Sequence, residues 1–195
     1  MSTTETESSP LAVPQEDERF YEALFQSVSS DLGMIIDQEL AIEDVRVTRE
    51  TARPAGMGGV HISFRVELTL GEATYHGCVL APLPDAITLA SFLMMVPEEE
   101  IEERRGLDDL DASLKDAMLE VGNFVAGAVD AVVRDWFDEG TTSRAAGCQG
   151  VRADVRPAFT YEEGDVLVVG RAKAELPGYE PFELIAMLPA PPASV

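Results

Sequence analysis

Apolar residues recur every three or four positions in two long stretches of the chain, which is the spacing of helices that bury one face. In the first stretch, from about 16 to 39, the apolar positions are Phe20, Leu24, Val28, Leu32 and Ile35. The second stretch runs from Leu107 to about Phe137, between Gly106 and Gly140, and contains no proline. We expect one helix over each stretch.

A shorter helix is predicted between these two. Asp85 is a suitable N-cap for a helix over Ala86 to Met95, and Pro97 stops the pattern. The charged run from Glu98 to Arg105 is interpreted as a solvated loop or a helical turn.

Alternation with a period of two replaces the helical spacing in the rest of the chain. From Val60 to Leu70, apolar residues alternate with polar ones, which predicts a strand with one buried face. A turn at Gly71 suits a second strand over Ala73–Leu80, and the residues around Val45 and Val47 indicate a shorter strand before both. After the last helix, three more strands are predicted over Val151–Tyr161, Asp165–Glu175 and Phe182–Leu188.

The predicted order is helix, three strands, two helices and three strands. Such runs are typical of an α+β fold, in which helices pack against a mostly antiparallel sheet. The 195 residues suffice for one domain, which we place at 16–188. Segment 1–15, rich in Ser, Thr, Glu and Pro, and the Pro-rich segment 189–195 are expected to be disordered tails.

The charge balance restricts the classes of partner. With 36 Asp and Glu against 14 Lys and Arg, the net charge is −22, which repels nucleic acid and anionic membranes. The longest strongly apolar run, Ile87 to Val96, is half of the roughly 20 residues that span a bilayer. No secretory signal precedes Arg19, so we expect a cytoplasmic protein. Cys78 and Cys148 lack CxxC spacing and are expected to be free thiols.

The helix predicted over 107–137 has a polar stripe opposite its apolar face. On a helical wheel centred on Val121, the far side carries Asp116, Glu120, Asn123, Gly127, Asp130 and Arg134. Asn123 is the only asparagine of the chain, and asparagine has a low propensity for the middle of a helix. Gly127 costs about 1 kcal/mol relative to alanine there. Two unfavourable residues on one exposed stripe indicate a functional surface, and a merely solvated face is the alternative.

The segment Asp116-Ala-Met-Leu-Glu120-Val-Gly-Asn123-Phe-Val-Ala-Gly127 resembles the signature of the CheC/CheX/FliY family of chemotaxis phosphatases. That signature is an Asp or Ser, a Glu four residues later and an Asn three residues after the Glu, often with a small residue further on. The strand, hairpin, short helix and acidic linker before the segment are similar as well, so the resemblance covers about residues 16 to 188. The single copy of the motif is more similar to CheX than to the two-copy CheC and FliY members.

The resemblance implies a phosphatase that hydrolyses the aspartyl phosphate of a response-regulator receiver domain such as CheY. It assigns the attacking water to Asn123 and a pair with the receiver's active-site lysine to Glu120, with Asp116 and Gly127 as further binding residues. The Mg²⁺ of the reaction would belong to the receiver, so no cofactor of this chain is expected. His61 and His76 also lack the spacing of a zinc site.

Two further expectations concern partners. A non-catalytic module that binds a receiver or a flagellar switch component is the alternative to the enzyme, because fold does not fix function. The presence of both Glu120 and Asn123 favours the enzyme. The resemblance to CheX and the apolar terminal strand Phe182–Leu188, if it lies at a sheet edge, predict a homodimer.

The chain departs from the family pattern at one position. The family often has a proline 23 residues after the Asn, where this chain has Ala146.

Overall fold

The computed structural model describes residues 11–54, 58–107, 110–137, 140–162 and 164–190. The elements in chain order are α1 (Gln15–Ile36), β1 (Ala41–Glu50), β2 (His61–Leu70), β3 (Ala73–Pro82), α2 (Leu83–Leu93), α3 (Glu98–Arg105), α4 (Ala112–Trp136), β4 (Thr142–Val151), β5 (Leu167–Glu175) and β6 (Phe182–Pro189). This is the predicted order with one short helix, α3, added. The α+β fold class is therefore confirmed. The predicted tails lie for the most part outside the described residues.

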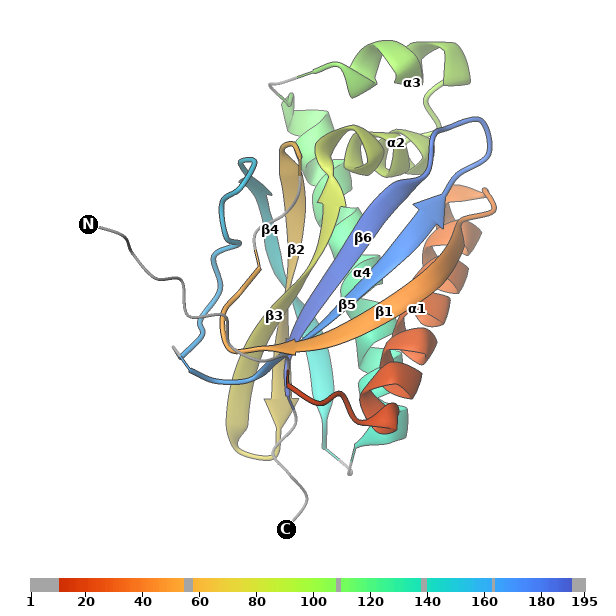
Figure 1. The fold of residues 1–195 in the computed structure, drawn as a ribbon. Coiled ribbons are helices and arrows are strands. Elements are labelled where there is room, and N and C mark those ends of the chain that lie inside the picture. Colours follow the sequence, from red (N-terminus) through yellow and green to blue (C-terminus); the bar gives the residue numbers. More distant parts are fainter. Residues whose placement is uncertain (1–10, 55–57, 108–109, 138–139, 163, 191–195) are drawn as a thin grey trace, which may run out of the picture.

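The strands of the described residues form one antiparallel sheet in the order β1-β5-β6-β3-β2-β4 (Figure 1). The last strand, β6, lies inside the sheet, where Met187 is opposite Val169 of β5 and Cys78 of β3. A strand flanked on both sides has no free edge to offer to a second copy. The predicted edge-to-edge pairing through Phe182–Leu188 is therefore wrong, whereas self-association itself stays a prediction.

The two long helices lie antiparallel on one face of the sheet, α1 against β1 and β5, and α4 against β4 and β2 (Figure 1). Where they meet, the Phe20 ring lies 5.8 Å from the ring of Trp136. Tyr21 fixes α1 to β5, because its hydroxyl donates to the Val168 carbonyl at 2.5 Å. Its ring covers Gly170 so closely that a Cβ at this glycine would overlap it. The main core lies between this helical layer and the sheet.

The opposite face of the sheet carries a smaller apolar cluster, formed by Cys78, Leu80, Leu167, Val169, Ile185 and Met187. Phe159 and Tyr161, from the segment between β4 and β5, pack over it. The Cζ of Arg53 lies 5.4 Å from the centre of the Phe159 ring and 5.5 Å from the centre of the Tyr161 ring. The same guanidinium donates to the carbonyls of Pro157 and Phe159. This segment is thus a cover for the sheet.

One predicted strand is wrong, because the residues predicted as Val151–Tyr161 are the covering segment and β4 ends at Val151. The left-handed backbone of Asp154 (φ 58°) and the ring of Pro157 prevent a regular ladder after Val151. β4 is poor in β-branched residues, but it pairs with β2 and packs against α4. Tertiary contacts therefore place this strand where local propensity does not.

The helix boundaries also differ from the prediction. Asp85 is not the N-cap of α2, since Pro82 has that position and Asp85 lies in the first turn. There Asp85 is buried, with its Oδ1 3.1 Å from Nη1 of Arg105. That ion pair and the fully buried Ile101 hold the charged run 98–105 as helix α3, so the helical alternative is correct. Within the described residues, no helix is long and apolar enough to cross a bilayer.

Candidate functional site

Helix α4 presents the predicted polar stripe to solvent. The helix begins after Asp111, whose side chain caps it by accepting from the Leu114 backbone N–H at 2.8 Å. Its sheet-facing side is buried as predicted at Leu114, Val121, Val125 and Val132. All four residues of the motif are exposed on the opposite side, namely Asp116, Glu120, Asn123 and Gly127. The packing of the apolar face thus orients the motif outward.

The two central residues of the motif interact directly. The Asn123 amide Nδ2 donates to Glu120 Oε2 at 3.2 Å, across one turn of α4. This bond uses one of the amide's two protons and leaves the carbonyl oxygen and the second proton for a ligand. Glu120 and Asn123 therefore form a preorganised pair in which a neutral amide lies beside a carboxylate.

Gly127 and Asp116 flank this pair. A Cβ built on Gly127 would meet no atom within 4 Å, so the surface is open one turn beyond Asn123. This differs from Gly122 of the same helix, where a Cβ would lie 3.3 Å from the Phe64 ring. Of these two glycines, only Gly122 lies where packing inside the protein requires a small residue. Asp116 is exposed one turn before Glu120 and extends the stripe toward the start of the helix.

Leu119 belongs to the same surface and was missed by the sequence analysis. Its side chain is 43% exposed, and it lies beside Glu120 and four residues before Asn123. The helical wheel contained this signal, because a step of two residues is a rotation of about 200° and places Leu119 nearly opposite Val121. An exposed leucine therefore lies next to the polar pair on this surface.

Asp130, at the far end of the stripe, has a structural role instead. Its Oδ1 accepts from the Ser143 backbone N–H at 2.6 Å, and its Oδ2 lies 2.7 Å from Nε of Arg134. The first contact joins α4 to the start of β4. We therefore end the candidate site at Gly127.

The other chemistry-bearing side chains lie away from α4. Burial raises the pKa of Cys78 to about 12 and also raises the pKa of Cys148, so neither thiol is an activated nucleophile. Both cysteines are free, as predicted. His61 is buried, with Nδ1 2.9 Å from the Gly59 carbonyl oxygen. The described residues contain no group of three or more His, Cys, Asp and Glu that could hold a metal ion.

Comparison with solved structures assigns the fold. FliY from Thermotoga maritima superposes with a TM-score of 0.67 at 15% identity, covering 92% of each chain. The FliM middle domain from H. pylori gives 0.61 at 10% identity over 91% of this chain and 94% of that one. CheX from Desulfovibrio desulfuricans gives 0.55 at 14% identity over 87% and 99%. The chain has the fold of the CheX, FliY and FliM proteins. No protein-family model and no curated protein sequence matches it.

Within this CheX-like fold, the departure from the family pattern at Ala146 coincides with a break in β4. The register between β2 and β4 shifts between the pairs of Phe64 and Val66. Gly147, the next residue, has a φ of 91°, which a residue with a side chain rarely adopts. A bulge therefore occupies the place where the family often has a proline.

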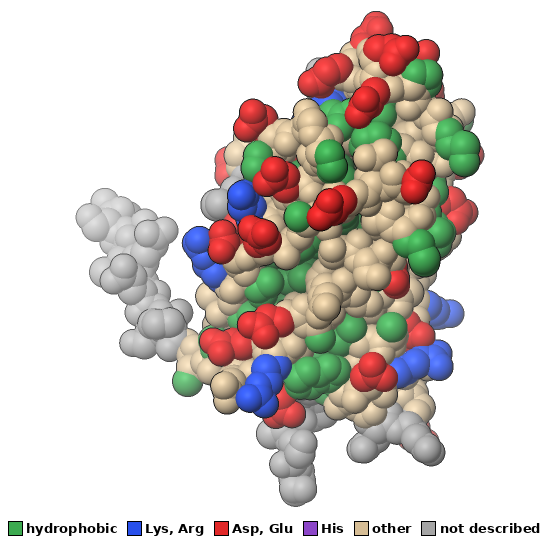
Figure 2. All heavy atoms as spheres, turned by 90° about the vertical axis from the view of Figure 1, so that its right-hand side faces the viewer, with side chains coloured by type: hydrophobic (Ala, Val, Ile, Leu, Met, Phe, Trp, Pro, Cys, Tyr) green, Lys and Arg blue, Asp and Glu red, His purple; other side chains and the backbone are tan. Residues whose placement is uncertain are grey.

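Figure 2 shows acidic side chains spread over the face that carries α1, in agreement with the net charge.

Proposed function

We propose that this protein is a phosphatase that hydrolyses the aspartyl phosphate of a response-regulator receiver domain, with α4 as its docking and catalytic surface. The observation that carries the proposal is the exposed Glu120–Asn123 pair, bonded at 3.2 Å beside the open surface at Gly127. The fold shared with CheX and FliY supports it independently.

Asn123 positions the attacking water. Its side-chain oxygen accepts a hydrogen bond from the water, which aligns the oxygen lone pair of that water with phosphorus. A neutral amide suits this role, because a carboxylate in its place would repel the phosphoryl oxygens. The bond to Glu120 limits rotation of the amide, so the water is held with little loss of side-chain entropy at the moment of reaction.

Glu120 docks and orients the receiver. Its carboxylate is exposed and pairs with the receiver's active-site lysine, as the resemblance implies. A charged pair across an interface fixes register and orientation. Leu119 adds an apolar contact at the same turn, and Gly127 leaves room for the receiver backbone to approach. Asp116 extends the acidic stripe that attracts the lysine.

No group of this chain changes covalently during the reaction. Water attacks phosphorus in line, the bond between phosphorus and the receiver's aspartyl oxygen breaks, and the carboxylate leaves. Inorganic phosphate and one proton are released. The Mg²⁺ that neutralises the phosphoryl oxygens belongs to the receiver. Positioning is sufficient here, because an acyl phosphate is already reactive and phosphoryl transfer depends mainly on alignment and electrostatics.

A non-catalytic adaptor is the second candidate, and the similarity to FliM favours it. The FliM middle domain from H. pylori shares the fold, and another FliM structure from H. pylori is a complex with SpeE, superposing with a TM-score of 0.62 at 7% identity. The same α4 surface would then bind a protein without hydrolysis. Enzyme and adaptor differ in one measurable respect, which is whether bound receiver loses its phosphate.

The experiment measures binding and hydrolysis together. Purified protein is mixed with each phosphorylated receiver of the source genome, and both complex formation and phosphate loss are followed. The phosphatase proposal predicts faster loss for at least one receiver, and Glu120→Gln should weaken binding to that receiver. Binding to a phosphorylated receiver with an unchanged rate of phosphate loss would support the adaptor instead.

A further inference from the structure

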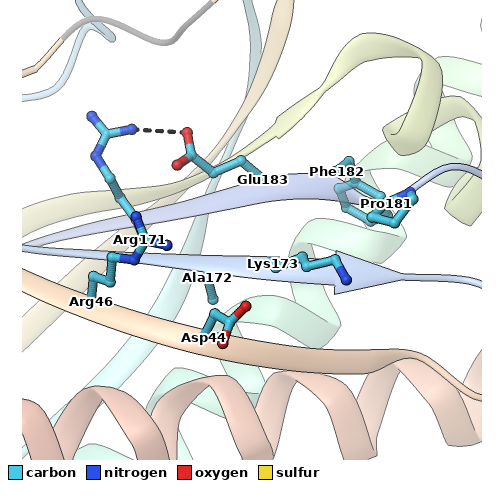
Figure 3. A pocket seen from close by; sticks show the side chains of 8 residues that line it. All are labelled: Asp44, Arg46, Arg171, Ala172, Lys173, Pro181, Phe182 and Glu183. Carbon is cyan, nitrogen blue, oxygen red and sulfur yellow. Dashed lines mark hydrogen bonds and ion pairs between the residues drawn. The ribbon is translucent and has the colours of Figure 1, made fainter.

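Three cationic side chains of this acidic protein lie around a cleft on the face of the sheet opposite the helices α1 and α4. It lies across β1, β5 and the start of β6 and has a volume of about 340 Å³, within the range of small-molecule sites. It is lined by Asp44, Arg46, Arg171, Ala172, Lys173, Pro181, Phe182 and Glu183. Figure 3 shows the charged side chains on neighbouring strands, with Pro181 and Phe182 at one end.

The strand register places two of these cations directly against each other. Arg46 of β1 is the cross-strand partner of Arg171 of β5. Like charges that are directly opposite in an antiparallel pair destabilise the sheet unless an anion lies between them. Lys173, two residues after Arg171, is on the same face of β5 because side chains alternate along a strand. The fold therefore brings together three positive charges that repel one another.

The carboxylates of the cleft compensate this charge only in part. Glu183 accepts from Nη1 of Arg171 at 2.9 Å. Lys173 reaches only Glu175, at 3.7 Å and with both side chains about half exposed, where such a pair contributes little. Arg46 forms no ion pair within the described residues. Asp44 also lines the cleft, so three cations face two carboxylates, one of which is already used by Arg171.

Unlike Arg46, five arginines outside the cleft have a carboxylate partner among the described residues. The arginines that pair with a carboxylate outside the cleft are Arg49, Arg104, Arg105, Arg134 and Arg144. The backbone next to Arg46 is also irregular, since Asp44 has a φ of 54° and the β1–β5 register shifts between Glu43 and Arg46. Bulges of this kind re-aim side chains and are frequent beside functional sites.

We propose that this cleft is a binding site for a small oxyanion carrying phosphate or carboxylate groups. The anion lies between Arg46 and Arg171, accepts from their guanidinium groups and is contacted by Lys173. A guanidinium suits this ligand, because its planar donors match two oxygens of a phosphate or carboxylate. The anion removes the repulsion between the two arginines, so binding also stabilises the strand pair β1–β5.

The test titrates the full chain with inorganic pyrophosphate and, separately, with succinate, at constant ionic strength. Backbone amide resonances report where each anion binds, and the two anions distinguish phosphate from carboxylate chemistry. The expected result is a saturable change confined to β1, β5 and β6 with at least one anion. Arg46→Gln should raise the Kd about tenfold, the effect of losing one charged hydrogen bond.

Arg156→Gln is the matched control, because Arg156 is exposed outside the cleft and should leave the Kd unchanged. Without anion, Arg46→Gln should fold and be at least as stable as the unmodified protein, since the substitution removes the like-charge pair. The proposal is overturned if neither anion gives a saturable change at these strands. It is equally overturned if Arg46→Gln and Arg156→Gln bind as the unmodified protein does.

Discussion

Gly127→Ala should stabilise the fold and slow the reaction at the same time. Gly127 is in the interior of α4, where alanine is favoured over glycine by about 1 kcal/mol. The new methyl group would meet no atom within 4 Å, so no packing cost offsets this gain. For a chain of 195 residues, about 1 kcal/mol corresponds to a rise in Tm of roughly 2–4 °C.

Gly122→Ala is the matched control on the same helix. It has the same backbone gain, but its Cβ would lie 3.3 Å from the ring of Phe64, which is itself buried. Crowding in a packed core costs about 1–3 kcal/mol, so the stabilisation should be cancelled or reversed. Urea unfolding followed by the fluorescence of Trp136, the only tryptophan, measures both variants.

Activity separates the two roles of Gly127. The added methyl group lies one turn from Asn123, where the receiver approaches, so dephosphorylation should slow by roughly tenfold through misplacement of the docked receiver. A Gly127→Ala variant that is less stable than the unmodified protein would refute the packing argument. A variant that gains stability and keeps full activity would remove Gly127 from the proposed site.

The remaining predictions concern the fold around the site. Gly170→Ala should lower the free energy of unfolding by about 3 kcal/mol or more, because the Tyr21 ring covers this glycine. Tyr21→Phe should lower it by about 1 kcal/mol, because the hydrogen bond to the Val168 carbonyl is lost. A urea midpoint at or above that of the unmodified protein would contradict either prediction. At pH 8 a thiol reagent should label Cys148 in the folded protein and Cys78 only after unfolding, and early double labelling would contradict this. Because burial raises the folded pKa of Cys78 to about 12, its contribution to stability is complete below the unfolded value of about 8.5 and is lost as pH rises toward 12.

The parts of the fold that the sequence predicts are those in which local pattern and tertiary packing agree. The alternation over 60–70 and the apolar face of α4 are both local, and both are present in the structure. β4 is different, because its small residues owe their strand conformation to pairing with β2, which lies about 80 residues earlier in the chain. The prediction of Asp85 as an N-cap fails for a similar reason, since its partner Arg105 comes from another helix.

The functional surfaces also divide into features that the local sequence predicts and features that depend on tertiary structure. The exposure of Glu120 and Asn123 could be predicted, because a helical wheel needs only the sequence of one helix. Leu119 could have been found by the same wheel. The pair of Arg46 and Arg171 could not, since it depends on the register between strands that are far apart in the sequence.

The central claim is that Asn123 positions the attacking water, and the rate of phosphate loss from a cognate receiver tests it most directly. The rate is measured with saturating unmodified protein, with Asn123→Ala and with Gln26→Ala, which removes an exposed amide from α1. We expect Asn123→Ala to keep its stability and to slow phosphate loss roughly 10²-fold, the effect of losing one positioned transition-state contact. Gln26→Ala should match the unmodified protein. A receiver that loses phosphate equally fast with Asn123→Ala and with the unmodified protein would contradict this role for Asn123.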